Sequence, residues 1–196
     1  MEKLLFINSC PRVEGVSRTL KLCDVFLEKY KRNHNDTELI RRDLFAESIK
    51  CYSLDEIEER DKLITQKAFE NPMFKYAHEF SESDKILIGA PYWDLSFPAI
   101  LKAYIESVCV NGITFHYTAS GVEGLCVAKK LMYITTSGGF AGEKGYGIQY
   151  IEAIGEFLGI SDYLFFSADG LDIAELDTTE IMKKAVVDIA KVAKYF

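Results

Sequence analysis

Short apolar runs recur along this chain, and segments with helical character separate them. The runs expected to form strands are 3–8, 37–44, 85–90, 130–135 and 162–167. The run 85–90 is continuously apolar, which is typical of a strand buried on both faces of a sheet. Strands that alternate with helices favour a parallel sheet, so the pattern predicts an α/β fold. With 196 residues and neither a repeat nor a linker, the chain is expected to form one domain over 1–196. Helices are expected at 17–32, 54–69, 72–82, 98–110, 146–158 and 176–194, with residues 111–128 irregular.

Charge and cysteine usage exclude several classes of function. The formal net charge of −7 at pH 7 argues against a nucleic-acid surface and against an anionic membrane as partner. No stretch approaches the roughly 20 apolar residues that are needed to span a bilayer. The five cysteines are scattered without a C-x-x-C pair, and the three histidines share no spacing, so no metal site is expected. An odd, dispersed set of thiols fits a reducing compartment, and we expect a cytoplasmic protein.

The stretch 9–19 joins the first expected strand to the first expected helix. Ser17 stands where a helix N-cap is expected, and Arg18 and Thr19 follow in the first turn. A helix N-terminus has unpaired N–H groups and a positive dipole end, so two hydroxyls and a guanidinium there favour a phosphate site. The same residues also fit a helix cap that binds no ligand.

Three unusual loops follow expected strands of the sheet. They are the stretch 9–19, the segment 91–94 with Tyr92 and Trp93, and the segment 136–140 with Gly138 and Gly139. In an open α/β sheet, ligands bind outside the carboxyl ends of the strands. Together the loops offer an anion site, an aromatic surface and accessible backbone N–H groups, which a phosphorylated planar heterocycle would need. The aromatic residues could instead belong to the core, and the glycine pair could form an ordinary turn.

Several other nucleotide and phosphate sites do not fit these residues. The sequence has neither the G-x-G-x-x-G turn of dinucleotide-binding proteins nor a P-loop, and G-x-S-x-G is absent. In low-molecular-weight tyrosine phosphatases five residues separate the nucleophilic cysteine from the arginine, whereas seven separate Cys10 from Arg18. A receiver domain needs an aspartate where this chain has Gly89-Ala90-Pro91.

The segments that follow resemble a known family. Residues 89–105 read GAPYWDLSFPAILKAYI, 112–118 read GITFHYT and 121–125 read GVEGL. They are similar to the APMYNFxIPxxLKxYID and GxTFxYTxxGxxGL segments of FMN-dependent NADH:quinone oxidoreductases and azoreductases, which have a flavodoxin-like fold. The resemblance covers nearly the whole chain and is weakest at 45–80.

The resemblance implies a three-layer sandwich around a five-stranded parallel sheet of order 2-1-3-4-5, and a homodimer with one FMN per subunit. FMN would then be held by residues of four segments, with Trp93, Tyr117 and Phe140 as the walls of the substrate pocket. The implied cofactor-binding residues are Ser9, Ser17, Arg18 and Thr19 at the phosphate, Pro91, Tyr92, Trp93, Asp94 and Leu95 along the ring system, and Thr136, Ser137, Gly138, Gly139 and Phe140 over the pyrimidine.

The implied activity is transfer of two electrons from NAD(P)H through FMN to quinones or azo compounds by a ping-pong mechanism. The chemistry would take place at the flavin N5, without a catalytic side chain or a metal. The chain departs from the family at two positions: the loop arginine of S-R-G-G is missing, and Asp94 replaces an asparagine. A carboxylate near the flavin should disfavour its anionic reduced form. The alternatives are a one-electron flavodoxin-like carrier and a flavin-free scaffold. The sequence does not distinguish NADH from NADPH as the electron donor.

Overall fold

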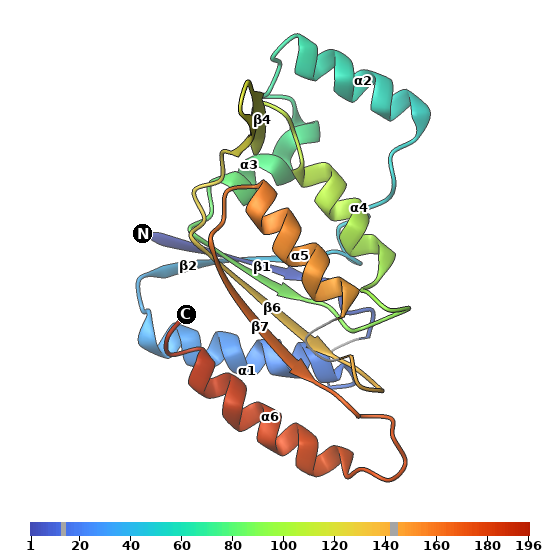
Figure 1. Cartoon of the computed structure of the whole chain (residues 1–196). Helices are drawn as coiled ribbons and strands as arrows, with labels where there is room; N and C mark the ends of the chain where they lie inside the picture. Colours follow the sequence, from blue (N-terminus) through green and yellow to red (C-terminus); the bar gives the residue numbers. More distant parts are fainter. Residues whose placement is uncertain (13–14, 142–144) are drawn as a thin grey trace.

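A parallel five-stranded sheet forms the centre of the computed structural model, which describes residues 1–12, 15–141 and 145–196 (Figure 1). The strand order is β2-β1-β3-β6-β7, and every neighbouring pair is parallel. The chain therefore runs from β1 to the edge strand β2, and then crosses to the other side of β1, where it adds β3, β6 and β7 in turn. The strands are β1 (Glu2–Asn8), β2 (Thr37–Asp43), β3 (Lys85–Gly89), β6 (Lys130–Thr136) and β7 (Asp162–Ala168).

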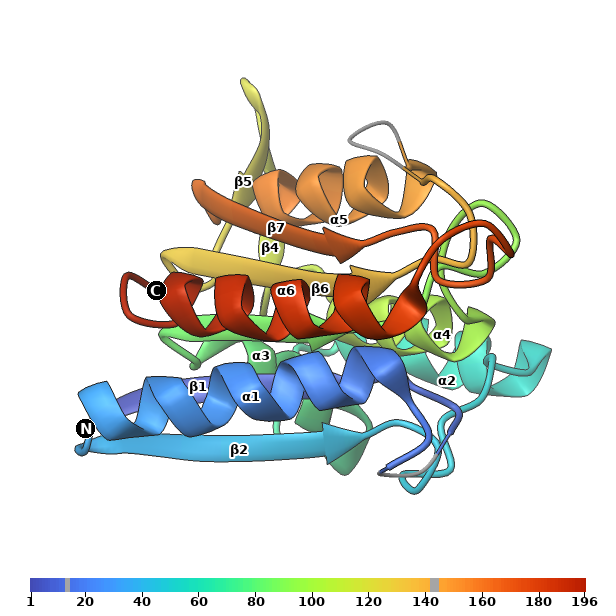
Figure 2. The same ribbon diagram turned by 90° about the horizontal axis from the view of Figure 1, so that it is seen from below.

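Helices cover both faces of the sheet and make three layers (Figures 1 and 2). Helices α1 (Arg18–Asn33) and α6 (Thr178–Val192) lie on one face, while α3 (Lys75–Ser81), α4 (Ala99–Val108) and α5 (Tyr146–Phe157) lie on the other. Side chains alternate along each strand, so Leu4 and Phe6 join the core under α1 and α6, and Leu5 and Ile7 join the opposite core. Burial on both faces explains why these strands are continuously apolar.

The expectation that residues 111–128 are irregular is wrong for part of that segment. Strands β4 (Phe115–Thr118) and β5 (Gly121–Gly124) pair as an antiparallel hairpin outside the main sheet. The hairpin strands are four residues long and largely exposed, so they lack the apolar pattern that identifies a strand. With the hairpin counted, the fourth and fifth strands of the main sheet become β6 and β7, and the implied order 2-1-3-4-5 corresponds to β2-β1-β3-β6-β7.

The helix expected at 54–69 is shorter than predicted. Helix α2 (Leu54–Thr65) begins with a capping box between Ser53 and Glu56. It ends early because Lys67 adopts a φ of 55°, a left-handed conformation that a helix cannot contain. A short 3-10 helix, η1 (Pro72–Phe74), then leads into α3. No helix of the described residues is long and apolar enough to cross a membrane.

Candidate cofactor site

A pocket of about 150 Å³ lies at the carboxyl edge of the sheet, where the strand arrows end in Figure 2. Loops after β1, β3, β6 and β7 contribute to its wall. Three of these loops are the ones that the sequence singled out, so the structure brings them together as expected. The lining residues are Pro11, Arg12, Ser17, Arg18, Thr19, Pro91, Tyr92, Trp93, Thr136, Ser137, Gly138 and Asp172. Residues 13–14 of the stretch 9–19 lie outside the described residues.

The first turn of α1 forms the polar floor of the pocket. Ser17 is the N-cap, and its hydroxyl accepts a hydrogen bond from the Leu20 N–H at 3.2 Å. Thr19 Oγ1 lies 2.6 Å from Thr136 Oγ1, which ties the helix to the end of β6. The first N–H groups of a helix have no partner within it, and the helix dipole is positive there. This floor can therefore hold an anionic group.

The loop after β3 presents the aromatic wall through a tight turn. Trp93 and Ser96 exchange both backbone hydrogen bonds, at 3.1 and 2.7 Å. The two residues between them, Asp94 and Leu95, have φ values of 49° and 69°. Left-handed backbone is unfavourable for a residue such as leucine, and strain of this kind gathers at ligand sites. The turn leaves Trp93 at the pocket with 44% of its surface exposed.

The loop after β6 is fixed by backbone hydrogen bonds to the loop after β7. Ser137 N–H donates to the Ala168 carbonyl at 3.0 Å, and Leu171 N–H donates to the Ser137 carbonyl at 3.1 Å. Asp172 N–H donates in turn to the Gly138 carbonyl at 2.9 Å. These contacts continue the pairing of β6 and β7 beyond the sheet, so this side of the pocket is built on rigid neighbours.

Several predicted site residues do not line the pocket of this chain. The Ser9 hydroxyl is fully buried and donates to the Gly89 carbonyl at 3.1 Å. Tyr117 lies on β4 of the hairpin and is 69% exposed, while Phe140 is 77% exposed. The other residues outside the lining are Asp94, Leu95 and Gly139.

Three lining residues were not predicted from the sequence. Pro11 and Arg12 belong to the stretch 9–19, so their position could have indicated them. Asp172 follows β7, and no local pattern marks the loop in which it lies. Its role becomes visible only in three dimensions, where it meets Arg18.

Within the part of the chain that the structure describes, no ionisable side chain near the pocket is arranged as a catalytic nucleophile. Burial raises the pKa of the Cys10 thiol to about 11, so the thiol is protonated and inert at neutral pH. His78 contacts the Phe69 carbonyl, and His116 pairs with Glu123 on the hairpin, away from the pocket lining. The described residues contain no cluster of His, Cys, Asp or Glu that could hold a metal ion.

A parallel sheet of order β2-β1-β3-β6-β7, with a pocket at its carboxyl edge between a helix N-terminus and an aromatic loop, is the arrangement of a flavodoxin-like protein. A family model described as "Flavodoxin-like fold" matches residues 2–193. A protein of Clostridium acetobutylicum named FMN-dependent NADH:quinone oxidoreductase 2 is 41% identical over the full length of both chains. A protein of Clostridium beijerinckii named FMN-dependent NADH:quinone oxidoreductase is 38% identical, also over both full lengths. The chain belongs to the flavodoxin-like family that includes these relatives, as the sequence resemblance predicted.

Solved structures give the same fold. An azoreductase of Bacillus anthracis superposes with a TM-score of 0.89 at 29% identity and covers 100% of both chains. An FMN-dependent NADH-azoreductase of Bacillus anthracis, solved in complex with FMN, superposes with a TM-score of 0.86 at 26% identity, with coverage of 100% of this chain and 99% of that one.

Proposed function

We propose that this protein is an FMN-dependent oxidoreductase that transfers two electrons from NADH, or from NADPH, to quinones or azo compounds. The pocket carries the proposal, because it combines the anion-binding floor of α1 with an aromatic wall at Trp93 and the backbone of 136–138. The names of the relatives support the same cofactor, donor and acceptors. When bound, FMN would supply the centre that accepts and donates hydride.

The residues of the pocket fit the chemistry of FMN. A phosphate needs N–H and O–H donors and positive potential, which the α1 N-terminus supplies with Ser17, Arg18 and Thr19. A flavin ring needs flat apolar contact on one side, which Tyr92 and Trp93 offer. Its pyrimidine edge needs hydrogen bonds, which Thr136, Ser137 and the Gly138 backbone can provide. The buried Ser9 would act indirectly, by holding the loop after β1 to β3 through its bond to Gly89.

The chain's own residues then determine access and electrostatics. Donor and acceptor would occupy the same exposed side of the pocket beside Trp93 in turn, which is a ping-pong reaction. Pro91 lines this side, and Asp94 adds a negative charge on the turn, shared with Leu95, that presents Trp93. Gly139 and Phe140 continue the loop after Gly138, and the exposed Phe140 ring would reach a bound substrate rather than the protein core.

We further propose that the protein is a cytoplasmic homodimer. All five cysteines are free, which fits a reducing compartment. Large apolar side chains on α2 and the hairpin are exposed in the single chain, namely Leu54, Tyr117 and Val122. Association of two copies would bury such residues, and Tyr117 would then reach a substrate pocket only as part of the dimer. Analytical ultracentrifugation would test the dimer directly.

The first experiment is to add FMN to the purified protein, remove unbound ligand by desalting, and add NADH under anaerobic conditions. We expect the flavin absorbance to stay with the protein and then to bleach. Retained FMN that neither NADH nor NADPH reduces, with a stable semiquinone on chemical reduction, would indicate a one-electron carrier instead. Failure to retain FMN would leave a flavin-free scaffold and refute the proposed function.

A further inference from the structure

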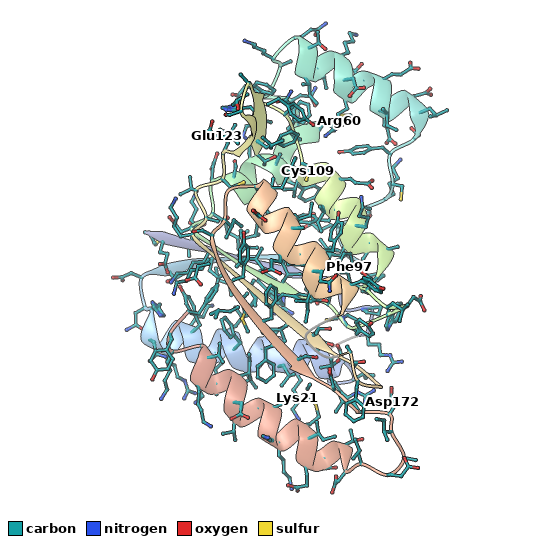
Figure 3. All side chains as sticks on the ribbon, in the orientation of Figure 1. Lys21, Arg60, Phe97, Cys109, Glu123 and Asp172 are labelled. Carbon is teal, nitrogen blue, oxygen red and sulfur yellow. The ribbon has the colours of Figure 1, made fainter. Side chains whose placement is uncertain are left out.

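One ion pair at the pocket links the first helix to the last loop of the sheet. Arg18 Nη2 donates to Asp172 Oδ1 at 2.7 Å, and Arg18 Nη1 donates to the Leu171 carbonyl at 2.8 Å. Arg18 and Asp172 both line the pocket, and Asp172 lies just beyond the carboxyl end of β7 (Figure 3). The guanidinium is therefore attached to the β7 loop at two points, beside the N-terminus of its own helix.

The carboxylate of Asp172 is itself held in place by the opposite loop. The backbone N–H of Asp172 donates to the Gly138 carbonyl at 2.9 Å, which positions the residue. A Cβ atom at Gly138 would lie only 2.4 Å from Asp172 Oδ2, so the carboxylate rests directly on the glycine backbone. Thr178 Oγ1 also donates to the Leu171 carbonyl at 2.9 Å, which fixes the start of the loop. Only glycine at position 138 leaves room for the Asp172 carboxylate in its observed position.

We propose that Asp172 is a positioning residue that holds Arg18 ready for the phosphate group of the bound cofactor. This inference rests on the proposed function. A guanidinium has five N–H donors, and the two contacts to the β7 loop leave the others available to an anion. A free arginine side chain samples many rotamers, and ordering it during binding reduces affinity. Asp172 orders Arg18 before the ligand arrives.

The negative charge of Asp172 also repels an anion, and the geometry decides which effect is larger. The Asp172 side chain is 66% exposed, so solvent and salt screen its charge. Arg18 is less exposed, at 32%, and its contact with a phosphate would be a direct charge-assisted hydrogen bond. Loss of the ordering contact therefore outweighs relief of the repulsion.

The test compares FMN with riboflavin, which lacks the phosphate, in titrations of the full-length apoprotein followed by flavin fluorescence. For D172A we expect about threefold weaker FMN binding, the size of one solvent-exposed ion pair, with riboflavin binding unchanged. In D172N the side-chain oxygen still accepts from Arg18, so this variant should bind FMN at least as tightly as the wild type. D188A removes the same charge from α6, where Asp188 pairs with Lys191 outside the lining of the cofactor pocket, and should change neither affinity.

A double-mutant cycle tests whether Asp172 acts on FMN binding through Arg18. R18Q should weaken FMN binding, and D172A should then cause no further loss in the R18Q background. The proposal is overturned if D172A binds FMN as tightly as the wild type, if FMN and riboflavin weaken equally, or if D172N is as weak as D172A. If the wild type itself does not bind FMN, the proposed function is refuted, and this inference, which rests on it, is refuted as well.

Discussion

Thr19 Oγ1 and Thr136 Oγ1 lie 2.6 Å apart and share one hydrogen bond between the first turn of α1 and the last residue of β6. Both side chains are buried, at 1% and 8% exposure. The pair links the first turn of α1, which forms the floor of the pocket, to the start of the loop 136–138. We expect this bond to matter both to stability and to the shape of the pocket.

Replacement of Thr19 by valine should therefore destabilise the protein. T19V keeps the shape of the side chain but removes the hydroxyl, so Thr136 loses this partner in a buried place. The free energy of unfolding should fall by about 1–2 kcal/mol. Urea denaturation measures it, and T19S, which keeps the hydroxyl, is the control. Equal stability of T19V and the wild type would contradict the prediction.

A methyl group at position 138 should act on the cofactor more than on the fold. In G138A the new Cβ would meet the Asp172 carboxylate, which is the end of a short side chain and can rotate away. The stability cost should be only about 1 kcal/mol, but Asp172 would leave Arg18 and FMN binding should weaken several-fold. Riboflavin is the matched control ligand, because it lacks the phosphate and should bind G138A as tightly as it binds the wild type. An unchanged FMN affinity in G138A would show that the contact with Gly138 is unimportant.

Trp93 should report cofactor binding directly. It is the one tryptophan of the chain and lies in the pocket lining, so all tryptophan fluorescence comes from the site. A flavin within contact distance should quench most of this emission, and the titration should give the same Kd as flavin fluorescence. W93F removes the signal while keeping an aromatic wall, so it should still bind FMN. Unquenched emission from the FMN-bound protein would exclude Trp93 from the flavin site.

Thiol reactivity should follow burial. Burial raises the pKa of Cys10 to about 11 and that of Cys126 to about 12, so neither thiol forms much thiolate at neutral pH. Iodoacetamide should label the exposed Cys51 first, and labelling of Cys10 should increase only as the pH rises toward 11. Peptide mass spectrometry identifies the labelled sites, with urea-unfolded protein as the fully labelled control. Rapid labelling of Cys10 in the native protein at neutral pH would contradict its burial.

The sequence predicted those parts of the fold that local patterns determine. The run 85–90 became β3 (Lys85–Gly89), because burial on both faces requires an uninterrupted apolar strand. Ser17 proved to be the N-cap of α1, since its hydroxyl is placed to accept the Leu20 N–H. The hairpin of β4 and β5 was missed, because its short exposed strands carry no periodic signal.

The site residues that could be predicted from local sequence are those that lie next to one another in one segment. Ser17, Arg18 and Thr19 stand together in the sequence and together in the pocket. Asp172 was missed because its partners are a glycine in the loop after β6 and an arginine in the first turn of α1, and no local pattern contains such a relationship. Tyr117 was assigned to the pocket through the family resemblance, and within this chain it lies on the exposed hairpin.

The link between Arg18 and Asp172 spans 154 positions of the chain, and the link between Thr19 and Thr136 spans 117. A growing chain on the ribosome would complete α1 long before it exposes the residues that close the pocket. Contacts between such distant residues form late in folding, because long loops must close first. Cofactor uptake should therefore follow synthesis of the last strand and its loop, so that incomplete chains do not capture flavin.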